Sequence, residues 1–126
     1  ELNIKTKKQD LEKFIPNFSN SMKNAEYLLG RKFAFRKILQ KDLAPNSYKQ
    51  LINKALFVCI SILLAKYDNT KLKELNIEFA LQQPLAYAIE IDHTLFYYLS
   101  YGTNGRANLL YTFKVLQELF DKIIKY

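Results

Sequence analysis

The stretch Ala55-Leu56-Phe57-Val58-Cys59-Ile60-Ser61-Ile62-Leu63-Leu64-Ala65 decides the fold of this 126-residue chain. It is apolar on nearly every side of a helix, with Ser61 as its one polar residue and a lysine at each end. A helix that is hydrophobic all round is usually buried, and this run falls short of the ~20 residues that a membrane span needs. We therefore expect a central core helix, from a cap at Asn46 or Ser47 to about Tyr67, and no membrane partner.

Apolar residues recur at helical spacing on both sides of this stretch. The pattern before it consists of Leu11, Ile15, Phe18, Met22, Ala25 and Leu29. Pro16 is expected to break that pattern because it has no N–H, and Gly30 is expected to end it as a C-cap. Farther along, helices are predicted over 71–83, 85–91 and 93–101, and from Thr103 or Asn104 to the C-terminus, with caps at Asp68–Thr70 and at Asp92.

The composition supports a helical fold. The chain has three glycines and three prolines, too few for the many turns of a sandwich or a barrel. At this length one domain is expected. We predict an all-α fold in which residues 1–126 form a single-domain bundle of five or six helices around the central apolar helix. Because the chain begins with Glu1 rather than Met, we expect it to be a fragment of a longer protein.

The formal net charge is +7, and the excess lies in the first half of the chain. Up to Lys54 there are twelve Lys or Arg against five Asp or Glu, whereas the numbers are equal from Ala55 onward. Cations interleaved with aromatics can hold phosphates and stack on bases. The candidate nucleic-acid contacts are Arg31, Lys32, Arg36 and Lys37, together with Arg106 in a tyrosine-rich region. The alternative is that Phe33 and Phe35 share one face of an extended segment and anchor it to the core, while the cations face solvent.

A second aromatic group gathers near Arg106. It consists of Tyr97, Tyr98, Tyr101 and Tyr111. Tyrosines beside an arginine can form a stacking platform. They can equally close one end of the core and direct their hydroxyls to water, and the sequence leaves both interpretations open.

The residues of reactive chemistry are few and scattered. A metal site needs several ligands at suitable spacing, and this chain has one Cys and one His, far apart. Cys59 lies in the apolar stretch, where a free Cys behaves as a small buried hydrophobe. His93 follows Asp92 at a predicted helix start and reads as a polar residue near a cap. We predict no catalytic residue, no metal and no cofactor, and the absence of a possible internal disulfide fits a cytoplasmic location.

Three segments together resemble a known family. They are Ala34–Lys37, Ile52–Phe57 and the turn Ser100–Asn104. Their order and spacing resemble the helical region downstream of the nuclease-like domain in the bacterial ParB/sulfiredoxin-like restriction-associated family, the relatives of the type IV restriction enzyme GmrSD. The resemblance covers about residues 14–124. It implies a cytoplasmic protein of DNA restriction or phage defence in which this non-catalytic helical domain supports or regulates an N-terminal domain of the same parent chain, with DNA as a possible further partner.

The matching residues have expected structural roles. Arg36 has five donors in a rigid fork and is expected to tie the basic connector to carbonyls at a helix end. Asn53, expected one turn inside the central helix, would pin the same connector through its side chain. Together with Thr103 these residues are our candidate structural fasteners. Two other functions stay open: a nucleic-acid-binding module acting through segment 31–37, and a helical protein-interaction or dimerisation domain that would make a homo-oligomer.

Overall fold

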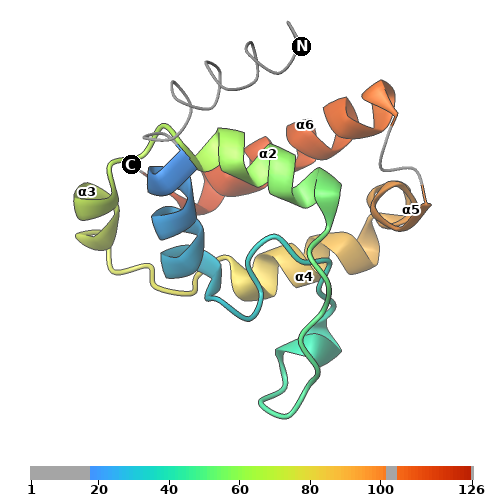
Figure 1. Ribbon diagram of the computed structural model, residues 1–126, viewed down its shortest axis with the longest axis horizontal. Coiled ribbons are helices and arrows are strands. Elements are labelled where there is room, and N and C mark those ends of the chain that lie inside the picture. Colours follow the sequence, from blue (N-terminus) through green and yellow to red (C-terminus); the bar gives the residue numbers. More distant parts are fainter. Residues whose placement is uncertain (1–17, 102–104, 126) are drawn as a thin grey trace, which may run out of the picture.

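The computed structural model describes residues 18–101 and 105–125, and within them the regular elements are all helices (Figure 1). A first helix covers residues 18–29 of the described part. It is followed by the 3₁₀ helix η1 (Gln40–Leu43) and by α2 (Lys54–Leu64), α3 (Asn69–Lys73), α4 (Gln82–Ile91), α5 (His93–Tyr101) and α6 (Arg106–Ile123). One isolated antiparallel bridge joins Arg36 and Ile52. The predicted all-α fold is confirmed, and none of the described helices is long and apolar enough to cross a membrane.

Helix α2 contributes most of the apolar stretch to the core and packs along α6 (Figure 1). Its buried residues are Ala55, Leu56, Cys59, Ile60, Ser61, Leu63 and Leu64. Val58 and Ile62, one turn apart on the remaining face, are 37% and 52% exposed. Buried side chains from α2, the 18–29 helix, α4, α5 and α6 belong to one continuous core.

The predicted start of this helix at Asn46 or Ser47 is wrong. Helix α2 begins at Lys54, and its N-cap is Asn53, whose side chain accepts a hydrogen bond from the Leu56 N–H. The residues before the cap use their polar groups elsewhere, since the Gln50 carbonyl accepts from the Arg36 guanidinium and the Ser47 hydroxyl donates to the Asp42 carbonyl. The end predicted near Tyr67 also falls later than the observed end at Leu64.

Polar side chains of the 18–29 helix close the C-terminal end of α2, where the last carbonyls have no partner within the helix. Ser21 Oγ donates to the Ser61 carbonyl at 2.6 Å. Asn24 Nδ2 donates to the carbonyls of Leu64 at 2.8 Å and Tyr67 at 2.9 Å. Ser21 and Asn24 are therefore fully buried, whereas Met22, which the apolar pattern placed in the core, is 37% exposed.

The long amphipathic helix predicted over 71–83 is also wrong. Helix α3 ends at Lys73, and a non-helical loop runs to α4. This loop satisfies the carbonyl end of the 18–29 helix: Phe79 N–H donates to Tyr27 O at 2.9 Å and Leu81 N–H donates to Leu28 O at 3.2 Å. These donors are committed to another helix, so the segment does not form the helix that its own periodicity indicates.

Several helix ends confirm the sequence prediction. Gly30 follows the first helix in the left-handed region at φ 84°. Asp68 accepts from the Lys71 N–H at the start of α3, and Asp92 accepts from the Leu95 N–H at the start of α5. The cap of α6 is Gly105, so the prediction of Thr103 or Asn104 as its cap is wrong. Residues 102–104 lie outside the described part, as do Pro16 and the pattern before it.

Candidate functional site

The cations of segment 31–37 do not line one extended strip. Residues 31–35 form turns in which Phe35 adopts φ 62°, so the expected extended segment is wrong. The two rings do anchor the connector as the alternative interpretation expected, since Phe35 is buried and Phe33 packs against the core. Arg31 Nε pairs with Glu26 Oε1 at 2.8 Å, and Lys32 Nζ lies 5.7 Å from the centroid of the Phe33 ring.

Lys37 is turned toward α5. Its Nζ donates to Ser100 Oγ at 2.9 Å and lies 4.9 Å from the centroid of the Phe96 ring. Lys37 also borders a hollow beside η1, different from the one that Arg31 and Arg36 border. The ammonium group of Lys37 therefore contacts α5 and does not join the other cations of the segment.

Asn53 joins three segments that are far apart in the sequence. Its backbone N–H donates to the Phe35 carbonyl at 2.8 Å, and its Nδ2 donates to the Leu99 carbonyl at 2.8 Å. With the cap bond to Leu56 N–H at 3.1 Å, each polar group of its side chain is used. The structure thus places Asn53 at the helix cap rather than one turn inside it, and it links the basic connector, α2 and the end of α5.

Arg36 connects the same region to the loop that precedes α2. Its Nη1 donates to the Gln50 carbonyl at 2.8 Å, which is a loop carbonyl and not the expected helix end. Its Nε is buried and has no hydrogen-bond partner among residues 18–101 and 105–125. Thr103, the third candidate fastener, lies outside the described residues.

A hollow of about 310 Å³ lies beside the 18–29 helix and brings two predicted contacts together. It is lined by Met22, Glu26, Arg31, Ala34, Phe35, Arg36, Lys49 and Ile52. Arg31, Arg36 and Lys49 supply three positive charges against the one carboxylate of Glu26. Lys49 lies distant in sequence from the basic segment and was not among the predicted contacts.

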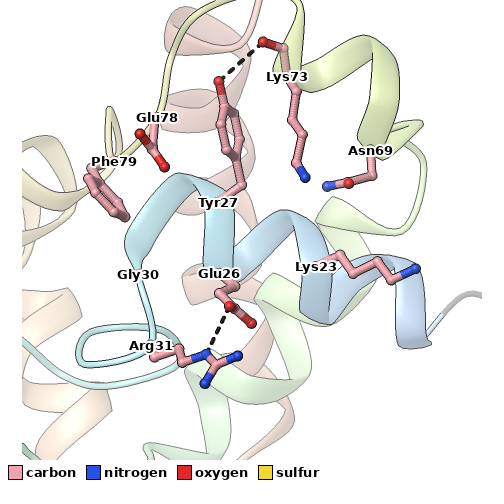
Figure 2. A pocket seen from close by; sticks show the side chains of 9 residues that line it. All are labelled: Lys23, Glu26, Tyr27, Gly30, Arg31, Asn69, Lys73, Glu78 and Phe79. Atoms are coloured by element: carbon pink, nitrogen blue, oxygen red, sulfur yellow. Dashed lines mark hydrogen bonds and ion pairs between the residues drawn. The ribbon is translucent and has the colours of Figure 1, made fainter.

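A larger groove of about 530 Å³ lies on another side of the same helix. Figure 2 shows its lining: Lys23, Glu26, Tyr27, Gly30, Arg31, Asn69, Lys73, Glu78 and Phe79. Tyr27 lies in the middle, with Glu78 and Phe79 on one side and Lys23 and Asn69 on the other (Figure 2). The Tyr27 hydroxyl accepts from the Ile77 N–H at 3.1 Å, so the floor of the groove is fixed to the loop before α4.

The tyrosines near Arg106 form a connected group on α5 and α6. The ring centroids of Tyr97 and Tyr101 are 5.4 Å apart, and Tyr98 and Tyr111 meet edge to face at 5.5 Å. Tyr97 and Tyr101 are 58% and 76% exposed. The Tyr111 hydroxyl donates to Asp92 Oδ2 at 2.7 Å, and this hydrogen bond raises the pKa of Tyr111. Arg106 is exposed at the first turn of α6.

The reactive side chains lie apart. Cys59 is buried, its thiol facing the Leu109 carbonyl at 3.7 Å, and burial raises its pKa to about 11. A thiol of that pKa holds little of the thiolate that acts as a nucleophile. His93 is exposed at the start of α5. Among the described residues no group of three or more His, Cys, Asp or Glu side chains is placed to hold a metal ion.

Comparison of the chain with protein-family models, curated proteins and solved structures finds no match. The candidate sites are therefore defined by the positions and charges of their own side chains. Lys23, Lys73 and Phe79 were not predicted from the sequence, because they come from separate segments with no shared spacing. The one available signal was the excess of cations before Lys54, a part of the sequence that includes Lys23 and Lys49.

Proposed function

We propose that this chain is a non-catalytic helical domain of a bacterial, cytoplasmic restriction or phage-defence protein, which supports or regulates an N-terminal nuclease-like domain of the same parent chain. One observation carries the proposal. Within the described residues, parts of the three resembling segments lie together: the Asn53 N–H donates to the Phe35 carbonyl, and Lys37 Nζ donates to the hydroxyl of Ser100, the residue after Leu99, whose carbonyl accepts from the Asn53 side chain.

The proposal that the domain is non-catalytic is supported by the state of its reactive groups. The thiol of Cys59 is buried and its pKa is raised. The Tyr111 phenol is held protonated by Asp92, because the hydrogen bond between them raises the pKa of Tyr111. Neither group is prepared as a nucleophile or a base near neutral pH.

Two measurements test this function. The purified chain, incubated with DNA, magnesium and nucleoside triphosphates, is expected to show no hydrolysis, and turnover that follows the chain through purification would overturn the non-catalytic assignment. In cells, deletion of residues 18–125 from the parent gene is expected to abolish phage restriction while the nuclease-like domain remains expressed. Restriction at the original level would overturn the supporting role.

A second candidate function is binding of the nucleic-acid backbone, favoured by the hollow that Arg31, Arg36 and Lys49 share. Three cations on one concave surface can neutralise phosphates, and each neutralised phosphate of a duplex contributes a slope of roughly −0.9 to the dependence of log affinity on log salt. The double variant Arg36→Gln/Lys49→Gln is expected to lower that slope by up to about 2. The charge-matched control Lys114→Gln/Lys122→Gln on α6 should leave it unchanged, and equal effects of the two double variants would reject the hollow as the site.

A further inference from the structure

We propose that the groove of Figure 2 binds a single strand of nucleic acid, with one base stacked on Phe79 and the neighbouring phosphates held by Lys23 and Lys73. This inference goes beyond the proposed function, because it assigns a ligand to a surface other than the hollow lined by Arg36 and Lys49. The groove lies between the 18–29 helix, α3 and the loop before α4. Its volume of about 530 Å³ is in the range of ligand-binding clefts.

Phe79 is the first reason for the inference. Its backbone adopts φ 60°, a left-handed conformation that is unfavourable for a bulky residue, and its ring is 48% exposed. Residues held in such conformations cluster at binding and catalytic sites. Here the strained backbone presents an aromatic ring at the edge of a groove instead of placing it in the core.

The surroundings hold this ring in place. The Phe79 N–H donates to the Tyr27 carbonyl at 2.9 Å, which fixes the backbone on the end of the 18–29 helix. Gly30 lies against the ring, since a Cβ at Gly30 would be 3.3 Å from Phe79 Cε1. An aromatic ring that is already positioned loses little conformational freedom when a base stacks on it, so more of the stacking energy appears as affinity.

The charges in the groove are arranged unequally. The Arg31 guanidinium is paired with Glu26 at 2.8 Å, which leaves Lys23, Lys73 and Glu78 as the uncompensated charges. The ammonium groups of Lys23 and Lys73 have no hydrogen bond or ion pair within the described ranges 18–101 and 105–125, and both lysines are exposed. Glu78 lies beside Phe79 at the opposite side from Lys23 (Figure 2). The groove therefore has a cationic side suited to phosphate and an aromatic side with a carboxylate that can accept from a base amino group.

This arrangement favours a single strand over a duplex. In a duplex the faces of the bases are stacked on one another, and no face is available to Phe79 without unstacking, which costs a few kcal/mol. In a single strand each base can offer its face, and the phosphates remain available to lysines. An acidic peptide would satisfy the lysines but would gain nothing from the ring, so it is the competing occupant that the experiment must separate.

The experiment measures fluorescence anisotropy of the full 126-residue chain with a labelled single strand of about 12 nucleotides, with the matching duplex, and with a poly-glutamate peptide. Wild type is expected to bind the single strand more tightly than the duplex. Phe79→Asn removes the ring but suits the left-handed backbone, and it should weaken single-strand binding roughly 5- to 100-fold. Phe79→Tyr keeps the ring and should bind the single strand about as tightly as wild type does. Lys23→Gln/Lys73→Gln should reduce the salt slope by roughly 1.4.

Controls separate this inference from the second candidate function. Tyr87→Asn removes a comparably exposed ring from α4 and should leave single-strand binding unchanged, and circular dichroism confirms that each variant is folded. If Phe79→Asn binds the single strand as well as wild type does, or if the poly-glutamate peptide binds wild type as tightly as the single strand does, the stacking site is rejected. If only Arg36→Gln/Lys49→Gln weakens binding, the hollow is supported as the nucleic-acid site and the groove is rejected. If wild type binds no nucleic acid at low salt, both the hollow and the groove are rejected as nucleic-acid sites.

Discussion

At the scale of single residues, Asn53 shows how one side chain can hold several segments. An amide has both an acceptor and donors, and Asn53 uses the acceptor on the Leu56 N–H and a donor on the Leu99 carbonyl. Its backbone N–H then reaches the Phe35 carbonyl. Asp would keep the cap but lacks the donor for the cross-link, and Ser has a single, closer oxygen in place of two separate polar groups.

Replacing Asn53 by Ala should destabilise the fold by about 1–3 kcal/mol, the cost of a lost N-cap and of a carbonyl left without its donor. Asn53→Asp keeps the cap acceptor but places an oxygen against the Leu99 carbonyl, so it should not restore full stability. The measurement is urea unfolding followed by circular dichroism. Asn46→Ala, in the exposed loop, is the control and should change the free energy of unfolding by less than about 0.5 kcal/mol. Equal stabilities of Asn53→Ala and Asn46→Ala would contradict the fastener role.

At the scale of elements, the carbonyl end of the 18–29 helix is completed by a segment distant in the sequence. The last four carbonyls of a helix have no partner within it. Glu26 O accepts from the Gly30 N–H, and Tyr27 O and Leu28 O accept from backbone groups of the loop before α4. Leu29 O accepts from the Gln82 side chain at 2.8 Å. Helix end and loop therefore depend on each other, and the conformation at Gly30 controls their contact.

Gly30→Ala should lower the free energy of unfolding by roughly 1–2 kcal/mol, because an L-residue is disfavoured at φ 84°. The new methyl would also lie 3.3 Å from the Phe79 ring, which must shift slightly, and 3.4 Å from Gln82 Nε2. Gly105→Ala is the matched control, since its φ is −78° and its new methyl meets only the Asn108 side chain. Thermal unfolding of the two variants checks this, and a melting temperature lowered equally by both would show that the conformation at Gly30 is not the cause.

The elements that the sequence predicted correctly are those with local signals. Asp68 and Asp92 each bond to a backbone N–H three residues on, and the predicted last helix is present as α6, with Leu116 and Phe120 buried. The segments 46–52 and 74–81 were predicted as helix but are not, because their polar groups bond to partners far away in the chain. A helical periodicity contains no information about such partners, so the sequence pattern could not show that these segments would bond to other parts of the chain instead of forming helices.

The groove was unpredictable for the same reason. Lys23, Lys73 and Phe79 come from the first helix, α3 and the following loop, and only the backbone bonds between that loop and Tyr27 bring them together. Ser21 and Asn24 carried a weak signal, since polar residues beside apolar ones on a helix can bond to another helix end. The apolar pattern instead selected Met22, which is partly exposed.

At the scale of the whole molecule, one core spans the chain, but its parts differ in how firmly they are held. Among the described residues, buried apolar side chains come from every helix except η1, whose buried residue is Asp42. By contrast, the loop between η1 and α2 extends away from the helices at the bottom of Figure 1. Tyr48 and Leu51 in this loop are 90% and 89% exposed. Such loops open at low cost in free energy and are cut first by proteases.

Within the described residues, trypsin should therefore cut first after Lys49, and mass spectrometry of a time course identifies the site. The nicked molecule should stay in one piece under native conditions, because Leu28, Leu29, Phe35 and Ile38 on one side of the cut are buried in the core shared with the other side. Full burial of each such side chain contributes about 1.5–3 kcal/mol. Size exclusion should show a single species that separates into two in denaturant. An earlier cut inside α2 or α6, or separation without denaturant, would mean that the core does not hold the two halves as described.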